Sequence, residues 1–239
     1  MTDSHLPPGR IRYHAVRLAL KAVTSAYVRT NVVGAEHIPG SGPYISCFNH
    51  PSWLDPVFFA AHWPDAERDL YSFGPREQDM STGVRNALIT WTRRGVPFQP
   101  EAQDVIDTTR RAVGVLKTGA CLAIAGEGRL SDHEGKILPL ETGLAHFAKL
   151  AWAPILPVGV VGTRWSSFGS RVTLRVGEAV HPGDFGGGKA GAREMTDVVE
   201  ARLEALLEGV EDRDPPGWFG RTISETFNDR PWLDQPETE

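Results

Sequence analysis

A histidine and an aspartate stand five positions apart where an apolar run ends and a helical pattern begins. The stretch reads Asn49-His50-Pro51-Ser52-Trp53-Leu54-Asp55-Pro56. On one continuous helix these two side chains would point roughly 140° apart, so they meet only if His50 lies in a turn before the helix. Pro51 makes that turn plausible. Asp55 could then hold one imidazole nitrogen and leave the other as a general base toward a substrate hydroxyl.

The same residues also fit a purely structural arrangement. Ser52-x-x-Asp55 resembles a capping box, in which Asp55 satisfies backbone donors at a helix start. His50 would then be an ordinary loop histidine. The octapeptide alone supports catalysis and capping about equally.

A second polar stretch leaves a later apolar run, and it reads Gly126-Glu127-Gly128-Arg129-Leu130-Ser131. Two residues without Cβ atoms let backbone N–H groups approach a bound anion, and Arg129 adds a forked, permanently charged donor. Glu127 would repel the same anion, so we expect it to turn away and orient a neighbouring residue. Taken alone, a tight turn with solvated charges explains the stretch more simply.

Together the two stretches resemble the motifs of the glycerolipid acyltransferase family, typified by 1-acylglycerol-3-phosphate O-acyltransferases. That family has a His-x4-Asp motif followed by a Glu-Gly-[Thr or Arg]-x-Ser motif. Two later stretches also resemble the family, and the likeness covers roughly residues 10 to 208: Leu138-Pro139-Leu140-Glu141-Thr142-Gly143 and Ala153-Pro154-Ile155-Leu156-Pro157-Val158.

The resemblance implies an O-acyltransferase. His50, oriented by Asp55, would take the proton from an acceptor hydroxyl that attacks the thioester of acyl-CoA or acyl carrier protein. Gly128 and Arg129 would hold the phosphate or head group of a lysophospholipid, with Glu127 and Ser131 completing the substrate site. No Gly-x-Ser-x-Gly nucleophile elbow is present, so no covalent acyl-enzyme is required, and we expect no cofactor or metal.

The sequence departs from the family pattern at two places. Members that use glycerol phosphates usually carry an arginine in a stretch like Ile-Pro-Val-Asp-Arg, whereas this chain has Val96-Pro97-Phe98-Gln99-Pro100. We expect Arg93, Arg94 or Arg76 to replace that arginine, or the acceptor to differ from lysophosphatidate. The chain also has Ala125-Gly126-Glu127 where Phe-Pro-Glu is more usual.

Charge is unevenly distributed along the chain. The net charge is -5, which argues against a nucleic-acid partner, yet residues 10–29 hold five basic residues and no acidic one. On a helical wheel an apolar stripe of Val16, Leu20, Val23 and Tyr27 lies beside a basic one of Arg10, Arg17 and Lys21. A helix of this kind could lie on an anionic membrane surface or pack on the domain by its apolar stripe.

The rest of the chain predicts one α/β domain. Short apolar runs alternate with helical patterns, which indicates a layered, mostly parallel or mixed sheet flanked by helices, preceded by the N-terminal amphipathic helix. We expect a leader and membrane-facing helix over 1–29, the acyltransferase domain over 30–210 and a C-terminal tail over 211–239. Cys47 and Cys121 are expected to be reduced packing residues.

The chain has no apparent signal peptide and no apolar stretch near the roughly 18 residues that span a bilayer. We therefore predict a cytoplasmic protein that associates peripherally with the membrane. Gly183-Asp184-Phe185-Gly186-Gly187-Gly188-Lys189 matches part of a phosphate-binding P-loop, but Ala190 replaces the Ser or Thr that binds magnesium. We interpret it as a flexible surface loop before a helix that begins near Met195.

Two other functions stay open from the sequence. The His50 and Asp55 pair could activate water, which would make the protein a thioester or ester hydrolase. Alternatively, the chain could be a peripheral lipid-binding protein built on an inactive acyltransferase fold. The intact His-x4-Asp motif argues against that second alternative.

Overall fold

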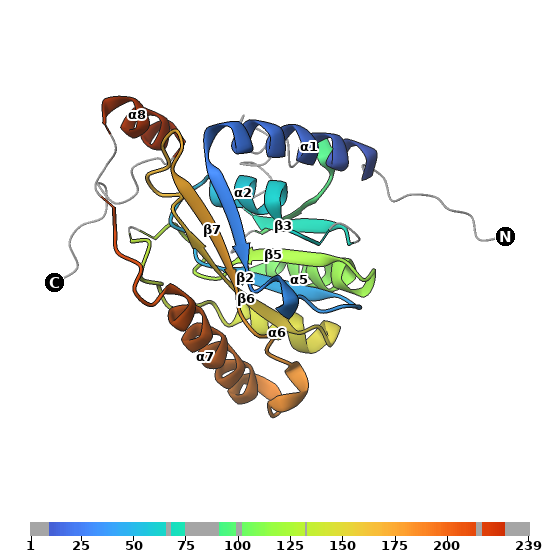
Figure 1. Ribbon diagram of the computed structural model, residues 1–239. Coiled ribbons are helices and arrows are strands. Elements are labelled where there is room, and N and C mark those ends of the chain that lie inside the picture. Colours follow the sequence, from blue (N-terminus) through green and yellow to red (C-terminus); the bar gives the residue numbers. More distant parts are fainter. Residues whose placement is uncertain are drawn as a thin grey trace.

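A mixed seven-stranded sheet forms the centre of the protein (Figure 1). The computed structural model describes residues 10–65, 68–74, 91–98, 102–131, 133–213 and 217–227. The strands lie in the order β1-β7-β6-β2-β5-β3-β4. Their bounds are β1 Arg29–Val33, β2 Tyr44–Phe48, β3 Leu70–Gly74, β4 Gly95–Pro97, β5 Cys121–Ala125, β6 Ile155–Val161 and β7 Arg171–Val176.

Five neighbouring strands run in one direction, and two at one edge run in the other. β6, β2, β5, β3 and β4 pair in parallel, whereas β7 pairs antiparallel with β6 and parallel with β1. β2 lies between β5 and β6, and all five of its residues are buried, as expected for a strand covered on both faces. Its carboxyl end leads directly into the His50 turn, so the chemistry lies at the edge of the sheet where parallel strands end.

Helices cover both faces of the sheet (Figure 1). α1 and α2 pack over Tyr44 and Phe48 on one face, while α5, α6 and α7 pack over Ile45 and Cys47 on the other. Alternating residues of β2 thus face opposite layers. The α-helices are α1 Arg10–Tyr27, α2 Asp55–His62, α5 Ala102–Lys117, α6 Gly143–Ala151, α7 Gly188–Leu207 and α8 Trp218–Phe227, with short 3-10 turns η1 Ala35–His37 and η2 Pro182–Asp184.

The structure confirms the α/β class, the mixed sheet and the N-terminal helix, and it corrects one helix boundary. α7 begins at Gly188, seven residues before the predicted Met195, so the end of the P-loop-like stretch is helical and the rest is the η2 turn and a short connection. Gly191 allows this early start, because a Cβ there would lie 1.8 Å from the carbonyl oxygen of Gly186. Glycine at this position therefore lets the first turn of α7 lie against the preceding backbone. The prediction of a flexible loop did not include this contact.

Two other helices complete the description. α2 begins at Asp55, after a turn over 51–54. The tail contains a helix, α8, that the sequence analysis did not predict. Arg76 lies outside the described residues.

Candidate active site

His50 and Asp55 meet as their spacing required. His50 follows β2 in the turn, Asp55 is the first residue of α2, and His50 Nδ1 lies 3.0 Å from Asp55 Oδ2. The same Oδ2 accepts the backbone N–H of Ser52 at 2.8 Å. Asp55 therefore both caps the turn and holds the imidazole, so the two interpretations of the motif are compatible.

Burial decides the electrostatics of this pair. Asp55 is fully buried and His50 is 7% exposed. Burial raises the pKa of the Asp55 carboxyl, and the hydrogen bond and charge of His50 oppose that rise, as do Thr163 and the Ser52 N–H. With Nδ1–H directed at Asp55, the Nε2 atom is the nitrogen available for proton transfer.

Glu127 lies behind the histidine and does not line the pocket. Its side chain is buried, and Oε1 accepts the backbone N–H of His50 at 3.3 Å. Burial raises the pKa of Glu127 to about 8. Glu127 thus contacts the backbone of His50, and the structure does not place its side chain in the pocket with Gly128 and Arg129, where the sequence analysis had counted it among the substrate-site residues.

The turn after β5 accounts for one departure from the family pattern. Gly126 donates its N–H to the Phe48 carbonyl at 3.0 Å, a bond that proline cannot make. A Cβ at Gly126 would also lie 2.5 Å from Cys47 Sγ and 2.8 Å from Leu140 Cδ2. This chain therefore anchors the turn to β2 by a backbone hydrogen bond, with no space for a side chain.

Gly128 and Arg129 reach the pocket beside His50. Gly128 has a positive φ of 67°, a left-handed conformation that suits glycine, and both residues are exposed and line the pocket. Ser131 is different, because it is buried and its hydroxyl donates to the His133 carbonyl at 2.9 Å. Its backbone N–H donates to the His50 carbonyl at 2.8 Å, so Ser131 contacts the site through the main chain.

A pocket of about 690 Å³ is lined by residues of α1, α2, α6 and the sheet. Its size falls within the range of small-molecule sites. His50, Gly128 and Arg129 line it where β2 and β5 end, and Arg94 lines it where β4 begins. The other walls are mainly apolar, with side chains from these helices, the strands and the adjoining turns: Val16, Leu20, Phe48, Trp53, Val57, Ala60, Leu70, Phe73, Phe98, Ile124, Leu144 and Phe147.

The two adjacent arginines proposed for the substrate site separate in the structure. Arg93 is exposed, adopts a left-handed backbone with φ of 56° and does not line the pocket. Arg94 is 3% exposed and lines it. Its guanidinium lies 3.3 Å from Asp69 and donates to the Tyr71 hydroxyl at 2.7 Å.

One important contact was missed from the sequence. Asn49 is fully buried, and its side chain exchanges two hydrogen bonds with the backbone of Val160, at 3.0 and 2.6 Å. This pairing extends the contact of β2 with β6 past Phe48, where β2 ends, and so fixes the direction in which the chain enters the His50 turn. A buried-strand pattern ending in asparagine, the residue directly before His50, was the available signal.

Three comparisons with known proteins bear on the family and the fold. The Acyltransferase family model matches residues 29–161, which is more than half of the chain, so the protein belongs to that family. The chain is 30% identical over 151 residues to human 1-acyl-sn-glycerol-3-phosphate acyltransferase alpha, covering 60% of this chain and 50% of the human one. The bovine protein of the same name is also 30% identical, covering 60% and 49% of the two chains. The chain thus spans about half the length of the curated relatives it matches.

A solved structure has the same fold. The crystal structure of the 1-acyl-sn-glycerophosphate (LPA) acyltransferase PlsC from Thermotoga maritima superposes with a TM-score of 0.63 at 24% identity. The match covers 84% of this chain and 81% of that one. At this identity the likeness concerns the fold.

Two features are absent from the described residues. No helix among them has the length and apolar character needed to cross a membrane. Within the same ranges, no three His, Cys, Asp or Glu side chains gather in a way that could hold a metal ion.

Proposed function

We propose that the protein transfers an acyl chain from a thioester to a hydroxyl of a lysophosphatidate-like acceptor. The observation that carries this proposal is the 3.0 Å contact of His50 with buried Asp55 at the end of an apolar pocket that also holds Gly128 and Arg129. Family membership and the relatives' names support the reaction class. The donor is acyl-CoA or acyl carrier protein.

The chemistry follows from the orientation of the imidazole. Nε2 of His50 removes the proton of the acceptor hydroxyl, and the oxygen attacks the thioester carbonyl carbon. When the tetrahedral intermediate collapses, the C–S bond breaks and the leaving thiolate takes the proton from the imidazolium. Asp55 holds the ring in the required tautomer and stabilises its transient positive charge.

We assign the acceptor's phosphate to Arg129 and the Gly128 turn, and not to Arg94. The pairing register across β4, β3, β5 and β2 sets Arg94 level with Ile45, five residues before His50. At about 3.3 Å per residue that separation is roughly 16 Å along the strands. The phosphate and free hydroxyl of a lysophosphatidate share one glycerol unit. The hydroxyl therefore cannot lie at His50 while the phosphate lies at Arg94.

The apolar length of the pocket suits the acyl chain. Its walls come from α1, α2, α6 and the sheet, and fatty chains bind by burying apolar surface. With the thioester carbonyl at His50, the chain would extend toward Arg94. Because α1 forms one wall through Val16 and Leu20, the helix takes part in binding.

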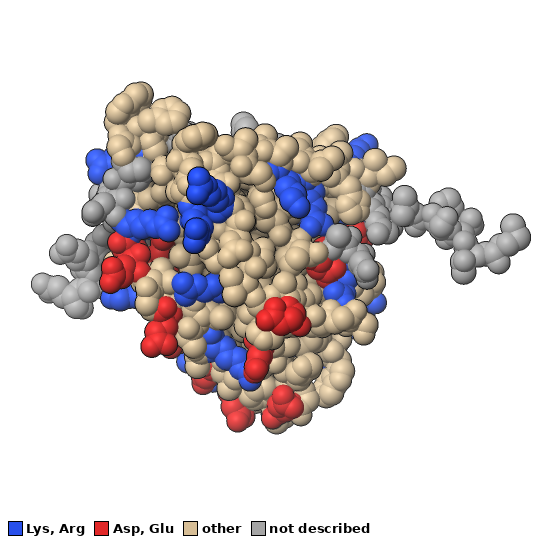
Figure 2. Space-filling view, viewed as in Figure 1, with Lys and Arg blue, Asp and Glu red and all other residues tan. Residues whose placement is uncertain are grey.

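We further propose that α1 rests on an anionic membrane surface. Val16 and Leu20, half of the predicted apolar stripe, face the pocket, but Ile11, Leu18 and Val23 are 75%, 71% and 67% exposed. Phe168, in the loop after β6, and Trp218 of α8 are both 80% exposed. α1 and α8 lie along the same side of the molecule (Figure 1), and that side carries mostly uncharged surface with basic side chains below it (Figure 2).

The membrane proposal is tested by sedimentation with vesicles of phosphatidylcholine and phosphatidylglycerol. Trp218→Ala and Leu18→Ser should each lower the bound fraction. Trp152→Ala is the matched control, because Trp152 is 71% exposed directly after α6. α6 lies on the side of the sheet away from α1 and α8 (Figure 1). Equal binding by all variants and the parent protein would contradict the assignment.

The enzymatic proposal is tested by mass spectrometry with mixed acyl-CoAs, acyl carrier protein thioesters and a panel of lysophospholipids. We expect an acylated acceptor, lost in His50→Ala. Release of free fatty acid without acylated acceptor would identify a hydrolase instead. No turnover of any donor, with vesicle binding retained in His50→Ala, would favour the lipid-binding protein without catalysis.

A further inference from the structure

Two arginines lie opposite each other at one edge of the sheet. β1 is the edge strand and pairs in parallel with β7, and the register sets Arg29 directly against Arg171. Both side chains are exposed. Paired residues point to the same face and neighbouring strands lie about 4.8 Å apart, so the two guanidinium groups leave adjacent points of one surface. Like charges in this position repel each other, and an anion bound between them would remove the repulsion.

The other arginines near this edge are compensated, and these two are not. Arg175, further along the same face of β7, donates to a backbone carbonyl at the end of α7 at 2.7 Å. Arg164, in the loop before β7, donates to Asp212 Oδ1 at 3.2 Å. For Arg29 and Arg171, the part of the chain that the structure describes supplies no hydrogen-bond or ion-pair partner to the guanidinium. Guanidinium forks match phosphate oxygens, so a phosphate group is the anion that suits this pair.

The loop between β6 and β7 places an aromatic side chain beside the two cations. Phe168 is 80% exposed, and its ring centroid lies 6.5 Å from that of Tyr27 at the end of α1. Gly169 donates its N–H to the Tyr27 carbonyl at 2.8 Å, and Arg29 donates its N–H to the Ser170 carbonyl at 2.8 Å. The loop that carries Phe168 is therefore bonded to the chain where β1 begins. An exposed ring next to basic side chains suits the boundary between the head groups and acyl chains of a membrane.

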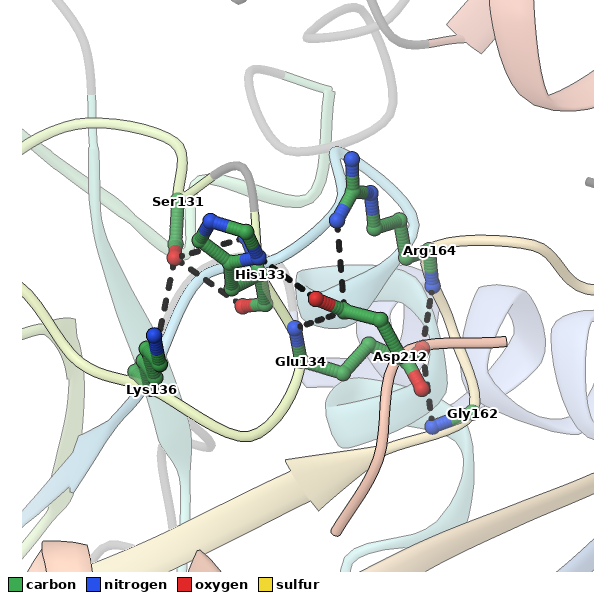
Figure 3. Close-up of polar contacts among 7 residues, drawn as sticks. All are labelled: Ser131, His133, Glu134, Lys136, Gly162, Arg164 and Asp212. Atoms are coloured by element: carbon green, nitrogen blue, oxygen red, sulfur yellow. Dashed lines mark hydrogen bonds and ion pairs between the residues drawn. The ribbon is translucent and has the colours of Figure 1, made fainter. Parts of the chain in front are cut away.

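A buried glutamate fixes the start of the same loop. Glu134 is 1% exposed, and its Oε1 accepts the backbone N–H of Gly162 at 3.1 Å and that of Arg164 at 2.9 Å. Figure 3 shows the carboxylate directed at these two donors, with Asp212 contacting the Arg164 guanidinium beside them. Because the loop is held at both ends, presenting Phe168 to a surface requires little further ordering of the chain.

We propose that Arg29 and Arg171 bind the phosphate of an anionic phospholipid in the membrane, while Phe168 enters the adjoining acyl region. A membrane supplies both the phosphate and the apolar layer next to it. Figure 2 shows basic side chains gathered over the β1 and β7 edge, below the mostly uncharged surface of α1 and α8. The inference rests on the membrane placement proposed above and assigns it a head-group site. None of the three residues lines the pocket, so this phosphate is not that of the acceptor.

Sedimentation with vesicles tests the site through charge-matched variants. Arg29→Gln/Arg171→Gln should lower the partition coefficient for vesicles of phosphatidylcholine and phosphatidylglycerol about 30-fold, since each basic residue near an anionic surface contributes about fivefold. Binding to pure phosphatidylcholine should change less than about twofold, because that surface has no net charge. Arg110→Gln/Arg193→Gln is the matched control. It removes the same charge from exposed positions on α5 and α7 and should stay within about threefold of the parent.

A charge-retaining variant separates a phosphate site from diffuse attraction. Arg29→Lys/Arg171→Lys keeps both charges but loses the forked geometry, so its binding should lie between that of the parent and that of the glutamine variant. Parental binding by the lysine variant, or an equal loss in the control variant, would overturn the site. Thermal stabilisation of the parent alone by inorganic phosphate, with equal vesicle binding by parent and glutamine variant, would assign the pair to a soluble phosphate and overturn the membrane site.

The two arginines could also serve to keep an edge strand from pairing with another chain. If that were their role, the glutamine variant would self-associate in light scattering while its binding to vesicles stayed parental. That result would overturn the proposal.

A second readout measures the depth of position 168. Cys47 and Cys121 are buried, so a nitroxide label can be attached selectively to Phe168→Cys. On vesicles that contain phosphatidylglycerol, collisions of the label with oxygen should increase relative to collisions with a water-soluble nickel complex. A label on Trp152→Cys should show no such change. A Phe168→Cys label that stays in water on the bound protein would overturn the proposal.

The results also distinguish this site from the proposed function. If no acceptor is acylated but the vesicle contrasts appear, the enzymatic proposal fails and the head-group site stands. If the parent binds no anionic vesicle, the membrane placement and the site fail together. If the parent binds and the Arg29→Gln/Arg171→Gln variant binds equally well, the site fails alone.

Discussion

Two cation–carboxylate pairs adjoin the same pocket through His50 and Arg94, and they differ in what they can do. His50 and Asp55 lie 3.0 Å apart where β2 ends, and Arg94 and Asp69 lie 3.3 Å apart where β3 and β4 begin. An imidazole exchanges a proton near neutral pH, whereas a guanidinium stays charged. The first pair can therefore carry a proton transfer, and the second can only hold a fixed charge.

The surroundings of the two pairs match this difference. The Arg94 guanidinium lies over the Tyr71 ring at 4.8 Å and the Tyr13 ring at 5.8 Å, which connects α1 to the sheet edge. Among the described residues, His50 is instead hydrogen-bonded at Nδ1 alone. A charge pair near a pocket therefore does not by itself indicate catalysis. Proton transfer requires a base whose nitrogen lone pair stays available, as in the imidazole of His50.

The largest expected effect is on catalysis at the first pair. His50→Ala should lower kcat for acyl transfer by about 10³-fold or more, since a positioned general base contributes about 10²- to 10⁴-fold. Steady-state turnover by mass spectrometry measures it. His62→Gln is the control, because His62 lies at the end of α2 and contacts Thr24, away from the pocket, and it should keep near-parental turnover. Full activity of His50→Ala would contradict the assignment of proton transfer to the His50–Asp55 pair.

The second pair should matter for stability. Arg94→Met leaves Asp69 without its guanidinium and removes two aromatic contacts, so the free energy of unfolding should fall by about 3 kcal/mol. Urea unfolding followed by circular dichroism measures this. Arg110→Met removes the arginine of an exposed pair with Asp107 and should cost under about 1 kcal/mol. If Arg94→Met instead abolished turnover with stability intact, the assignment of this pair would be wrong.

A smaller effect is expected for acceptor binding. Arg129→Ala should raise KM for a phosphorylated acceptor by about tenfold, with a smaller change in KM for the donor, because one charge-assisted hydrogen bond is worth about 1.5 kcal/mol or more. Arg93→Ala is the matched control, since Arg93 is exposed outside the pocket, and it should change neither constant. If Arg93→Ala raised KM for the acceptor and Arg129→Ala did not, the acceptor's phosphate would be assigned to Arg93 and Arg94, directly before β4.

A pH-dependent effect on stability is expected for Glu127. Burial raises its pKa from 4.5 to about 8, so between these values the folded state holds a proton that an unfolded glutamate has released. The unfolded state then binds fewer protons, and this residue makes stability fall as pH rises through that window. Urea unfolding at pH 5.5, 7 and 8.5 should show a shallower decline in Glu127→Gln. Identical slopes in both proteins would mean that this carboxyl does not titrate differently on folding.

The sequence alone was enough for the parts of the fold that depend on short-range patterns. The buried strand before His50, the turn required by His-x4-Asp spacing and the helix-strand alternation all follow from local periodicity and from proline geometry. Gly191 shows the limit, because the reason α7 starts early is a close approach to the Gly186 carbonyl that no periodicity reveals.

The candidate site was also only partly predictable from the sequence. His50, Asp55, Gly128 and Arg129 were identified from spacing and residue type. The structure brings His50, Gly128 and Arg129 to one pocket and places Asp55, fully buried, against His50. Arg93 and Arg94 could not be distinguished from sequence, because adjacent residues around a turn point in different directions and burial decided between them.

The amino-acid sequence specifies which residues carry reactive or charged groups. It also specifies which strands, turns and helices lie on either side of each group. The contacts of Asn49 with Val160 and of the His50 N–H with Glu127 join residues 111 and 77 positions apart, and they were visible only in the folded protein. The physical reason is that such contacts depend on strand order and register. Those arise when distant segments pack into one sheet, and they leave no mark on local spacing.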